Sequence, residues 1–173
     1  VRKIGSGNIG ATNVLRTGNK LLAFATLLLD VLKGYFPVVL TLHFFPEQYQ
    51  ISALMAFLGH IFPVWLKFNG GKGVATYLGI LFALSFKLSF LFIFTWIVTS
   101  LIFKYSSISS MFASFTILVV TLLKENVLKS LDPNFNIENN IQLLLFTFFI
   151  LIIFSHRKNI YNLKNETEKK IKL

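Results

Sequence analysis

Six apolar segments alternate with short polar ones along the 173-residue chain, at about 21–45, 51–66, 74–86, 88–103, 108–123 and 141–155. Each is continuously apolar and lacks the apolar–polar alternation of barrel strands, a pattern typical of membrane helices. Several are shorter than the roughly 20 residues that cross a bilayer squarely. The pattern predicts an all-α, polytopic membrane protein with about six transmembrane helices.

The composition supports this class and excludes others. Hydrophobic residues make up 54% of the chain and charged residues 14%, against about 25% charged in an average soluble domain. The net charge of +10 would suit a nucleic-acid-binding domain, but the apolar fraction would not, so no nucleic-acid partner is expected. Without cysteine, the chain has no disulfide, thiolate metal site or Cys nucleophile. Its length fits one domain over 1–173.

Basic residues collect on one predicted side of the membrane. If every apolar segment crosses, the segments 1–20, 67–73, 104–107 and 156–173 share a side and hold thirteen of the seventeen Lys and Arg residues. The positive-inside rule places that side in the cytoplasm. We interpret 156–173 as a basic cytoplasmic tail, and we expect Lys169, Lys170 and Lys172 to contact anionic lipid.

The first polar segment has the features of an anion-binding loop. Glycine lets backbone N–H groups approach an anion closely, and arginine can bind phosphate through two hydrogen bonds. The G-x-G-x-x-G match here does not indicate a dinucleotide site, because that fingerprint requires a preceding strand and a membrane helix follows instead. A flexible juxtamembrane loop is the alternative. The candidate residues are Gly5, Ser6, Gly7, Asn8, Asn13 and Arg16.

A second glycine-rich segment surrounds Lys72 and precedes the helix expected near Val74. Gly70, Gly71 and Gly73 favour an anion loop, and a helix N-terminus adds a favourable field. It is not a Walker A loop, because Leu66 stands at the first glycine position and Gly73 follows the lysine. A structural turn is the alternative. Nearby, His60 is expected to be packed and not catalytic.

The remaining polar residues lie at segment ends or inside a span. The hydroxyls of 105–110 are expected to cap a helix, with Ser107 also a candidate substrate contact. His156 and Asn159 are three residues apart and would share a helix face. Asp30 and Lys33, within the first span, are expected to pair, and both a structural and a functional role stay open. No metal-binding motif occurs, so neither a metal nor a cofactor is expected.

Together, these motifs resemble the bacterial acyl-phosphate-dependent glycerol-3-phosphate acyltransferases, an integral-membrane family. Residues 2–16 match R-K-x-G-S-G-N-x-G-A-T-N-V-x-R, and residues 29–34 resemble F-D-V-x-K-G. The pair G-H-x-F-P-V and F-x-G-G-K-G-V-A-T matches 59–64 and 68–76. The motif H-x-x-N-I-x-R-L, ending T-E-x-K, matches much of 156–170. The chain departs from the family at Asn162, where Arg is usual, and at Glu166, where Gly is usual.

The resemblance implies a reaction and its setting. A fatty acyl group would pass from acyl phosphate to the sn-1 hydroxyl of glycerol 3-phosphate, giving lysophosphatidic acid and phosphate for phospholipid biosynthesis. The implied partners are both substrates, membrane lipid and, functionally, the enzyme that makes acyl phosphate. The implied location is the bacterial cell (inner) membrane, multi-pass, with a cytoplasmic active site. Because the family has a span before its first motif, we expect this chain to lack that first helix.

The resemblance also implies which residues are catalytic. They are Ser6, Arg16, Lys72, His156 and Asn159, placed around the two phosphates. A small membrane transporter of an anionic metabolite is the main alternative, and it would predict binding groups near the bilayer midplane. A non-catalytic membrane scaffold is the other. The polar loops instead fall on one predicted face, which favours the enzyme.

Overall fold

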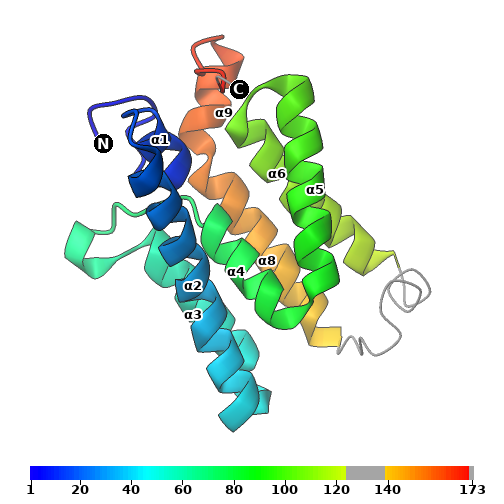
Figure 1. Ribbon diagram of the computed structural model, residues 1–173. Coiled ribbons are helices and arrows are strands. Elements are labelled where there is room, and N and C mark those ends of the chain that lie inside the picture. The colour runs from blue at the N-terminus through cyan, green and yellow to red at the C-terminus, as the bar shows by residue number, and fades with distance from the viewer. Residues whose placement is uncertain (124–138, 172–173) are drawn as a thin grey trace. The chain divides into compact units, whose positions relative to one another are not determined.

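The computed structural model describes residues 1–123 and 139–171, and every regular element in these ranges is a helix. The chain divides into two compact units, Val1–Leu84 and Ser85–Leu173 (Figure 1). The first contains α1 (Ala11–Leu15), α2 (Lys20–Phe44), α3 (Tyr49–Ile61) and α4 (Val74–Leu84), with short 3-10 turns at Pro46–Gln48 and Val64–Leu66. The second contains α5 (Phe86–Phe103), α6 (Ser106–Leu122), α8 (Asn139–Ser155) and α9 (Arg157–Lys164).

Each of the six predicted apolar segments coincides with a helix, so the all-helical membrane class is confirmed. Within the described ranges, three helical segments are long and apolar enough to cross a membrane, namely Lys20–Phe44, Pro46–Leu66 and Phe86–Phe103. There are four if α8 and α9, which are bent by 54° at their junction, form one span. Helices α4 and α6 are apolar but shorter. The number of six crossings therefore stays a prediction.

Local signals explain where the long helices begin and end. The Asn19 side chain accepts a hydrogen bond from the Leu22 N–H at 2.9 Å and caps the start of α2. Ser85 caps α5 in the same way, through the Leu88 N–H. Lys104, with φ of 61°, ends α5 in the left-handed conformation that commonly stops a helix.

The first unit depends on a close contact between the backbones of α2 and α4. A methyl group built on Gly34 would overlap the carbonyl oxygen of Thr76, and one on Gly79 would overlap that of Val31. Both glycines therefore let the helices approach more closely than any side chain would permit. Lipid tails are as apolar as leucine, so membrane helices associate through such packing and not through the hydrophobic effect.

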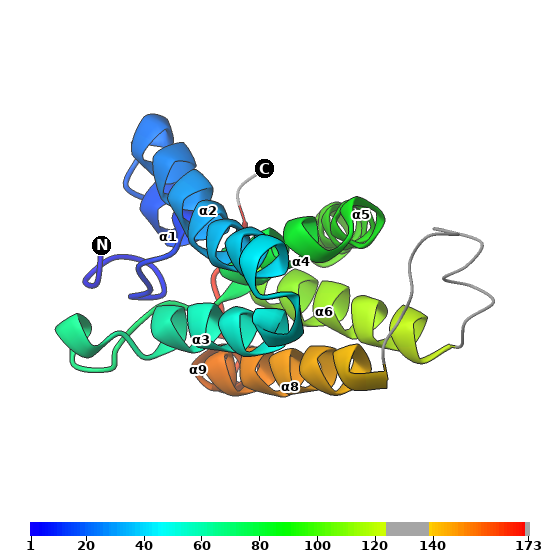
Figure 2. The same ribbon diagram turned by 90° about the horizontal axis from the view of Figure 1, so that it is seen from below.

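In the second unit, small hydroxyl side chains are buried where the helices pack together. Buried Ser and Thr residues lie on both α5 and α6, and most bond to a carbonyl of their own helix. One bond crosses between these helices, from Trp96 Nε1 to Ser110 Oγ at 3.1 Å. Helix α6 also runs beside α8 (Figure 2). There, Gln142 Nε2 donates to the Thr121 carbonyl at 3.1 Å.

Large apolar side chains face outward along the helices. Phe24 on α2 is 62% exposed, and Phe90 and Phe94 on α5 are 62% and 66% exposed. In water such faces would be unfavourable at about 25 cal/mol per Å². They are the surface expected of helices in contact with lipid.

The α2–α4 contact predicts that Gly79→Ala destabilises the fold. The added methyl group would force the helices apart, and we expect a loss of about 1–3 kcal/mol in the free energy of unfolding. Chemical unfolding in mixed micelles, followed by circular dichroism, measures this. Gly59→Ala on α3 is the control, because nothing lies within 4 Å of its added methyl group. Equal stability of the two variants would contradict this account of the contact.

Candidate active site

In the first unit, residues 1–10 fold around the side chain of Asn13. Its Oδ1 accepts from the Ser6 N–H at 2.9 Å, and its Nδ2 donates to the carbonyls of Asn8 at 2.7 Å and Val1 at 3.1 Å. Asn13 is only 2% exposed. The loop is thus held in one shape by a buried amide, unlike the flexible loop that the sequence left as an alternative.

Arg16 lies across this loop at Gly5. A methyl group on Gly5 would overlap Asn13 Oδ1 and lie 2.8 Å from Arg16 Cδ. Gly5 also has a φ of +60°, which favours glycine. The close approach places the guanidinium beside the exposed backbone of Gly5 and Ser6. The sequence-predicted Ser6 and Arg16 therefore do come together.

The second loop, residues 67–73, packs against the end of α3. The Gly70 N–H donates to the Ile61 carbonyl and the Gly71 N–H to the His60 carbonyl, both at 3.1 Å. These two N–H groups are therefore not anion donors, which corrects the expectation from the sequence. In the first loop the Gly7 N–H is likewise used, on the Ile4 carbonyl at 3.0 Å.

The glycines of the second loop serve close packing instead. A methyl group on Gly70 would overlap the His60 carbonyl oxygen, and one on Gly71 would overlap the His60 ring. Gly73 lies against the Phe57 ring with a φ of +82°. Lys72 stands half-buried in this loop, just before α4 begins at Val74 as predicted.

A direct hydrogen bond joins the two loops. Arg2 Nη2 donates to the Asn69 carbonyl oxygen at 2.5 Å. The glycine-rich loop that carries Arg16 and the one that carries Lys72 are therefore neighbours. Two cationic side chains are held on rigid backbone in one part of the unit.

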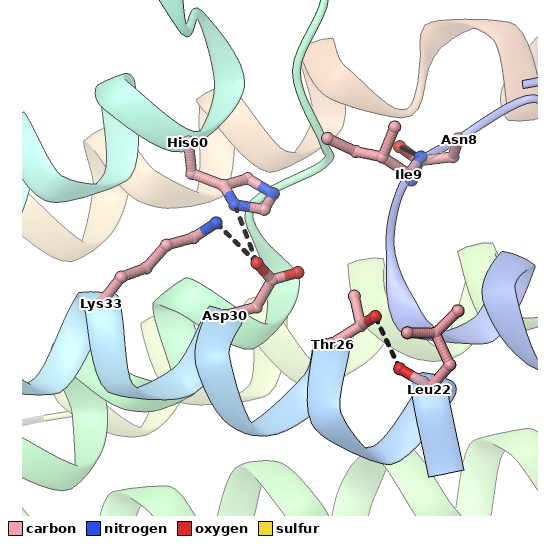
Figure 3. Close-up of polar contacts among 7 residues, drawn as sticks. All are labelled: Asn8, Ile9, Leu22, Thr26, Asp30, Lys33 and His60. Atoms are coloured by element: carbon pink, nitrogen blue, oxygen red, sulfur yellow. Dashed lines mark hydrogen bonds and ion pairs between the residues drawn. The ribbon is translucent and has the colours of Figure 1, made fainter. Parts of the chain in front are cut away.

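Beneath the second loop lies a small charged cluster (Figure 3). Lys33 Nζ and Asp30 Oδ1 are 2.5 Å apart, so the predicted ion pair is confirmed. His60 Nδ1 lies 3.7 Å from the same carboxylate oxygen. His60 is 7% exposed, which confirms that it is packed.

In the second unit, His156 occupies the break between α8 and α9. It is 1% exposed, and its Nδ1 lies 2.8 Å from the Ile152 carbonyl oxygen. A carbonyl can only accept, so the proton of a neutral ring belongs on Nδ1. The Nε2 atom is then the hydrogen-bond acceptor of the ring.

The carboxylate of Glu168 is the common hydrogen-bond acceptor of three polar side chains in this unit. Its Oε1 accepts from Asn159 Nδ2 at 2.5 Å and from Ser107 Oγ at 3.2 Å. Asn162, at the family's arginine position, places its Nδ2 3.5 Å from Oε2. The sequence interpretation did not select Glu168, although the T-E-x-K match was a signal, because the segment was taken for a basic tail.

One expectation for this region was wrong, and the expected contact of the tail lysines with lipid stays a prediction. The hydroxyls of 105–110 do not cap α6, whose N-cap residue is Tyr105 with no side-chain capping bond. Ser107 instead turns toward Glu168. The chain after α9 folds back, with the Ile171 N–H on the Lys104 carbonyl at 2.7 Å and Lys170 Nζ 5.9 Å from the Tyr105 ring centre. Lys172 lies outside the described residues.

The described residues define a helical integral membrane protein with two hydrogen-bonded, cation-bearing loops in its first unit. Residues 1–166 match the sequence model of the family described as glycerol-3-phosphate acyltransferase. The chain belongs to the glycerol-3-phosphate acyltransferase family. Membership favours an acyltransferase over the transporter and the scaffold.

Relatives and solved structures support the same conclusion. The glycerol-3-phosphate acyltransferase of Pelagibacter ubique is 49% identical over 173 residues, which are 100% of this chain and 84% of the relative. That of Mesorhizobium japonicum is 47% identical over 171 residues, 99% of this chain and 82% of the relative. This chain is also similar to the crystal structure of PlsY (YgiH), an integral membrane glycerol 3-phosphate acyltransferase, in its glycerol 3-phosphate form. The TM-score is 0.86 and the sequence identity 31%, and the match covers 99% of this chain and 82% of the PlsY chain. The lysphosphatidic acid form of PlsY matches with a TM-score of 0.83, which covers 95% of this chain and 80% of the PlsY chain.

The departure at Glu166 has a measurable consequence. Glu166 has a φ of 57°, in the region that suits the glycine usual in the family. We expect Glu166→Gly to raise the free energy of unfolding by about 0.5–1 kcal/mol, because it removes left-handed strain but adds backbone freedom. The control is Asn165→Gly, whose φ of −97° is ordinary and which should destabilise. Thermal unfolding in detergent compares the two variants. A lower stability of Glu166→Gly than of wild type would contradict the expectation that Glu166 is strained.

Proposed function

We propose that this acyltransferase takes its acyl group from a fatty acyl phosphate. The sn-1 oxygen of glycerol 3-phosphate forms a bond to the acyl carbonyl carbon, and the carbon–oxygen bond to phosphate breaks. The hydroxyl proton passes to the leaving phosphate, so lysophosphatidic acid and inorganic phosphate are the products. The PlsY structures in glycerol 3-phosphate and lysphosphatidic acid forms support the acceptor and the product.

The observation behind this proposal is the contact between the two cation-bearing loops, made by Arg2 and Asn69. Both substrates of the proposed reaction are phosphate esters or anhydrides, and fixed cations stabilise phosphate charge as it develops. An acyl phosphate is already activated, so no covalent acyl-enzyme is required. The sequence has no cysteine and no G-x-S-x-G nucleophile elbow, which agrees with direct transfer.

We assign the first-unit residues to separate roles. Arg16 and Lys72 bind phosphate in our assignment, and Ser6 adds a hydroxyl, since its N–H is already used on Asn13. Asn13 supports the loop, because its amide is already used by backbone groups. The glycines allow close packing, and we propose that most do so in place of direct contact with substrate.

The second-unit residues would orient the acceptor. In our assignment, His156 Nε2 accepts from the sn-1 hydroxyl. Asn159 uses its Nδ2 on Glu168, so its Oδ1 can accept from a second hydroxyl. Glu168 and Ser107 keep the Asn159 amide in place. Since the leaving phosphate takes the proton, no protein base is needed.

We further propose one catalytic domain over 1–173, in the inner membrane of a bacterial cell, with these residues on the cytoplasmic face. The enzyme that makes acyl phosphate would be its functional partner, because that substrate is consumed here.

The donor is tested directly with purified protein in proteoliposomes. Labelled glycerol 3-phosphate is supplied with acyl phosphate, and in separate reactions with acyl-CoA or acyl-carrier protein. We expect labelled lysophosphatidic acid from acyl phosphate alone, because only this donor leaves as phosphate. Product from a thioester donor but not from acyl phosphate would overturn the donor assignment.

The role of Lys72 is tested by Lys72→Ala. Loss of a charge-assisted hydrogen bond to phosphate should raise the KM for glycerol 3-phosphate roughly 10-fold to 100-fold. Lys67→Ala is the matched control, since Lys67 is an exposed lysine in the same loop. Steady-state kinetics over a range of glycerol 3-phosphate concentrations measures both. An unchanged KM in Lys72→Ala, or an equal rise in Lys67→Ala, would remove Lys72 from the phosphate site.

A further inference from the structure

We infer that Asp30 is a positioning residue, which fixes the ring of His60 and through it the loop that carries Lys72. The inference rests on the function proposed for Lys72. It concerns residues from three separate segments of the first unit. Asp30 on α2 and His60 near the end of α3 are drawn in Figure 3, and the loop 67–73 contacts the His60 ring through Gly71. In this role Asp30 does not touch a substrate.

The first step is the anchoring of the Asp30 carboxylate. Asp30 is 9% exposed on the apolar helix α2, where an unpaired charge would be unfavourable. Lys33, one helical turn later, lies 2.5 Å from Oδ1, and its side chain remains 45% exposed. The lysine therefore balances the charge of the carboxylate. The carboxylate is held at one place on the α2 surface.

The second step is the orientation of the His60 ring. Its Nδ1 is buried and has no hydrogen-bond partner among the residues that the structure describes. Leaving such an atom unsatisfied costs about 1–3 kcal/mol. The Asp30 carboxylate oxygen, 3.7 Å away, is too far for a standard hydrogen bond but close enough to attract an Nδ1–H dipole. This attraction favours the ring orientation with Nδ1 toward α2.

The third step links the ring to the loop. The opposite edge of the ring, which includes Nε2, lies so close to Gly71 that a methyl group there would overlap it. The Gly71 N–H also donates to the His60 carbonyl at 3.1 Å. Gly71 is thus fixed by both the ring and the backbone of His60. The next residue is Lys72, so a rotation of the ring would shift the lysine.

The kinetic test uses Asp30→Asn, which keeps the shape and removes the charge. We expect a roughly tenfold higher KM for glycerol 3-phosphate with kcat nearly unchanged, because substrate binding is weakened uniformly. Thr26→Val, one turn earlier on α2, is the matched control. It loses only the bond to the Leu22 carbonyl and should behave as wild type. Asp30→Glu restores a carboxylate and should recover most of the affinity.

A double-mutant cycle separates positioning from general damage. In a Lys72→Ala background, Asp30→Asn should add no further increase in KM, because its effect passes through Lys72. Additive increases would overturn the inference. His60→Gln removes the Nδ1 contact independently and should reproduce the Asp30→Asn phenotype, so the test stands even if Asp30→Asn fails to fold.

Amide hydrogen exchange supplies a readout that does not depend on activity. Followed by mass spectrometry in detergent, the Gly70 and Gly71 amides should exchange faster in Asp30→Asn and His60→Gln than in wild type or Thr26→Val. Wild-type protein that transfers no acyl group would refute the proposed function alone. Unchanged exchange in both variants, with a normal KM, would refute the positioning role while leaving the proposed function intact.

Discussion

The close packing of α2 on α4, through Gly34 and Gly79, sets the geometry of the first unit. Gly34 lies one helical turn after Asp30, and its contact residue Thr76, in the first turn of α4, lies four residues after Lys72. The same contact that joins the helices therefore fixes the distance between the buried carboxylate and the lysine loop. In a lipid environment such contacts cannot be replaced by a larger apolar side chain, since tighter approach is what favours association.

Many polar groups of the two loops form hydrogen bonds with nearby backbone groups of the protein. Asn13 uses its amide on three backbone groups, and Gly70 and Gly71 use their N–H groups on α3. Such loops are pre-ordered, so a substrate would not bear the entropic cost of arranging them. We assign phosphate binding to the side chains of Arg16 and Lys72, while the glycines here permit close packing more than they supply donors.

Much of the fold could be predicted because apolar runs are local signals. All six segments appear as helices with ends shifted by a few residues, and α4 begins at Val74 as expected. Contacts between distant residues could not be predicted. Asp30 and His60 are thirty positions apart, and Glu168 meets Ser107 from sixty-one residues away. A single sequence carries no pairing signal at such separations, so Glu168 was missed and the role of Ser107 was misjudged.

The carboxylates of Asp30 and Glu168 have similar positions in their clusters, each next to a neutral polar side chain. An anion that faced a phosphate would repel it by several kcal/mol at short range in a partly buried site. Asp30 instead lies behind His60, and Glu168 lies behind Asn159. In the roles that we propose, each carboxylate holds a neutral group in place, and that group or the lysine beside it meets the substrate. In the proposed reaction the hydroxyl proton then passes to the leaving phosphate, whose basicity rises as its bond to the acyl carbon breaks.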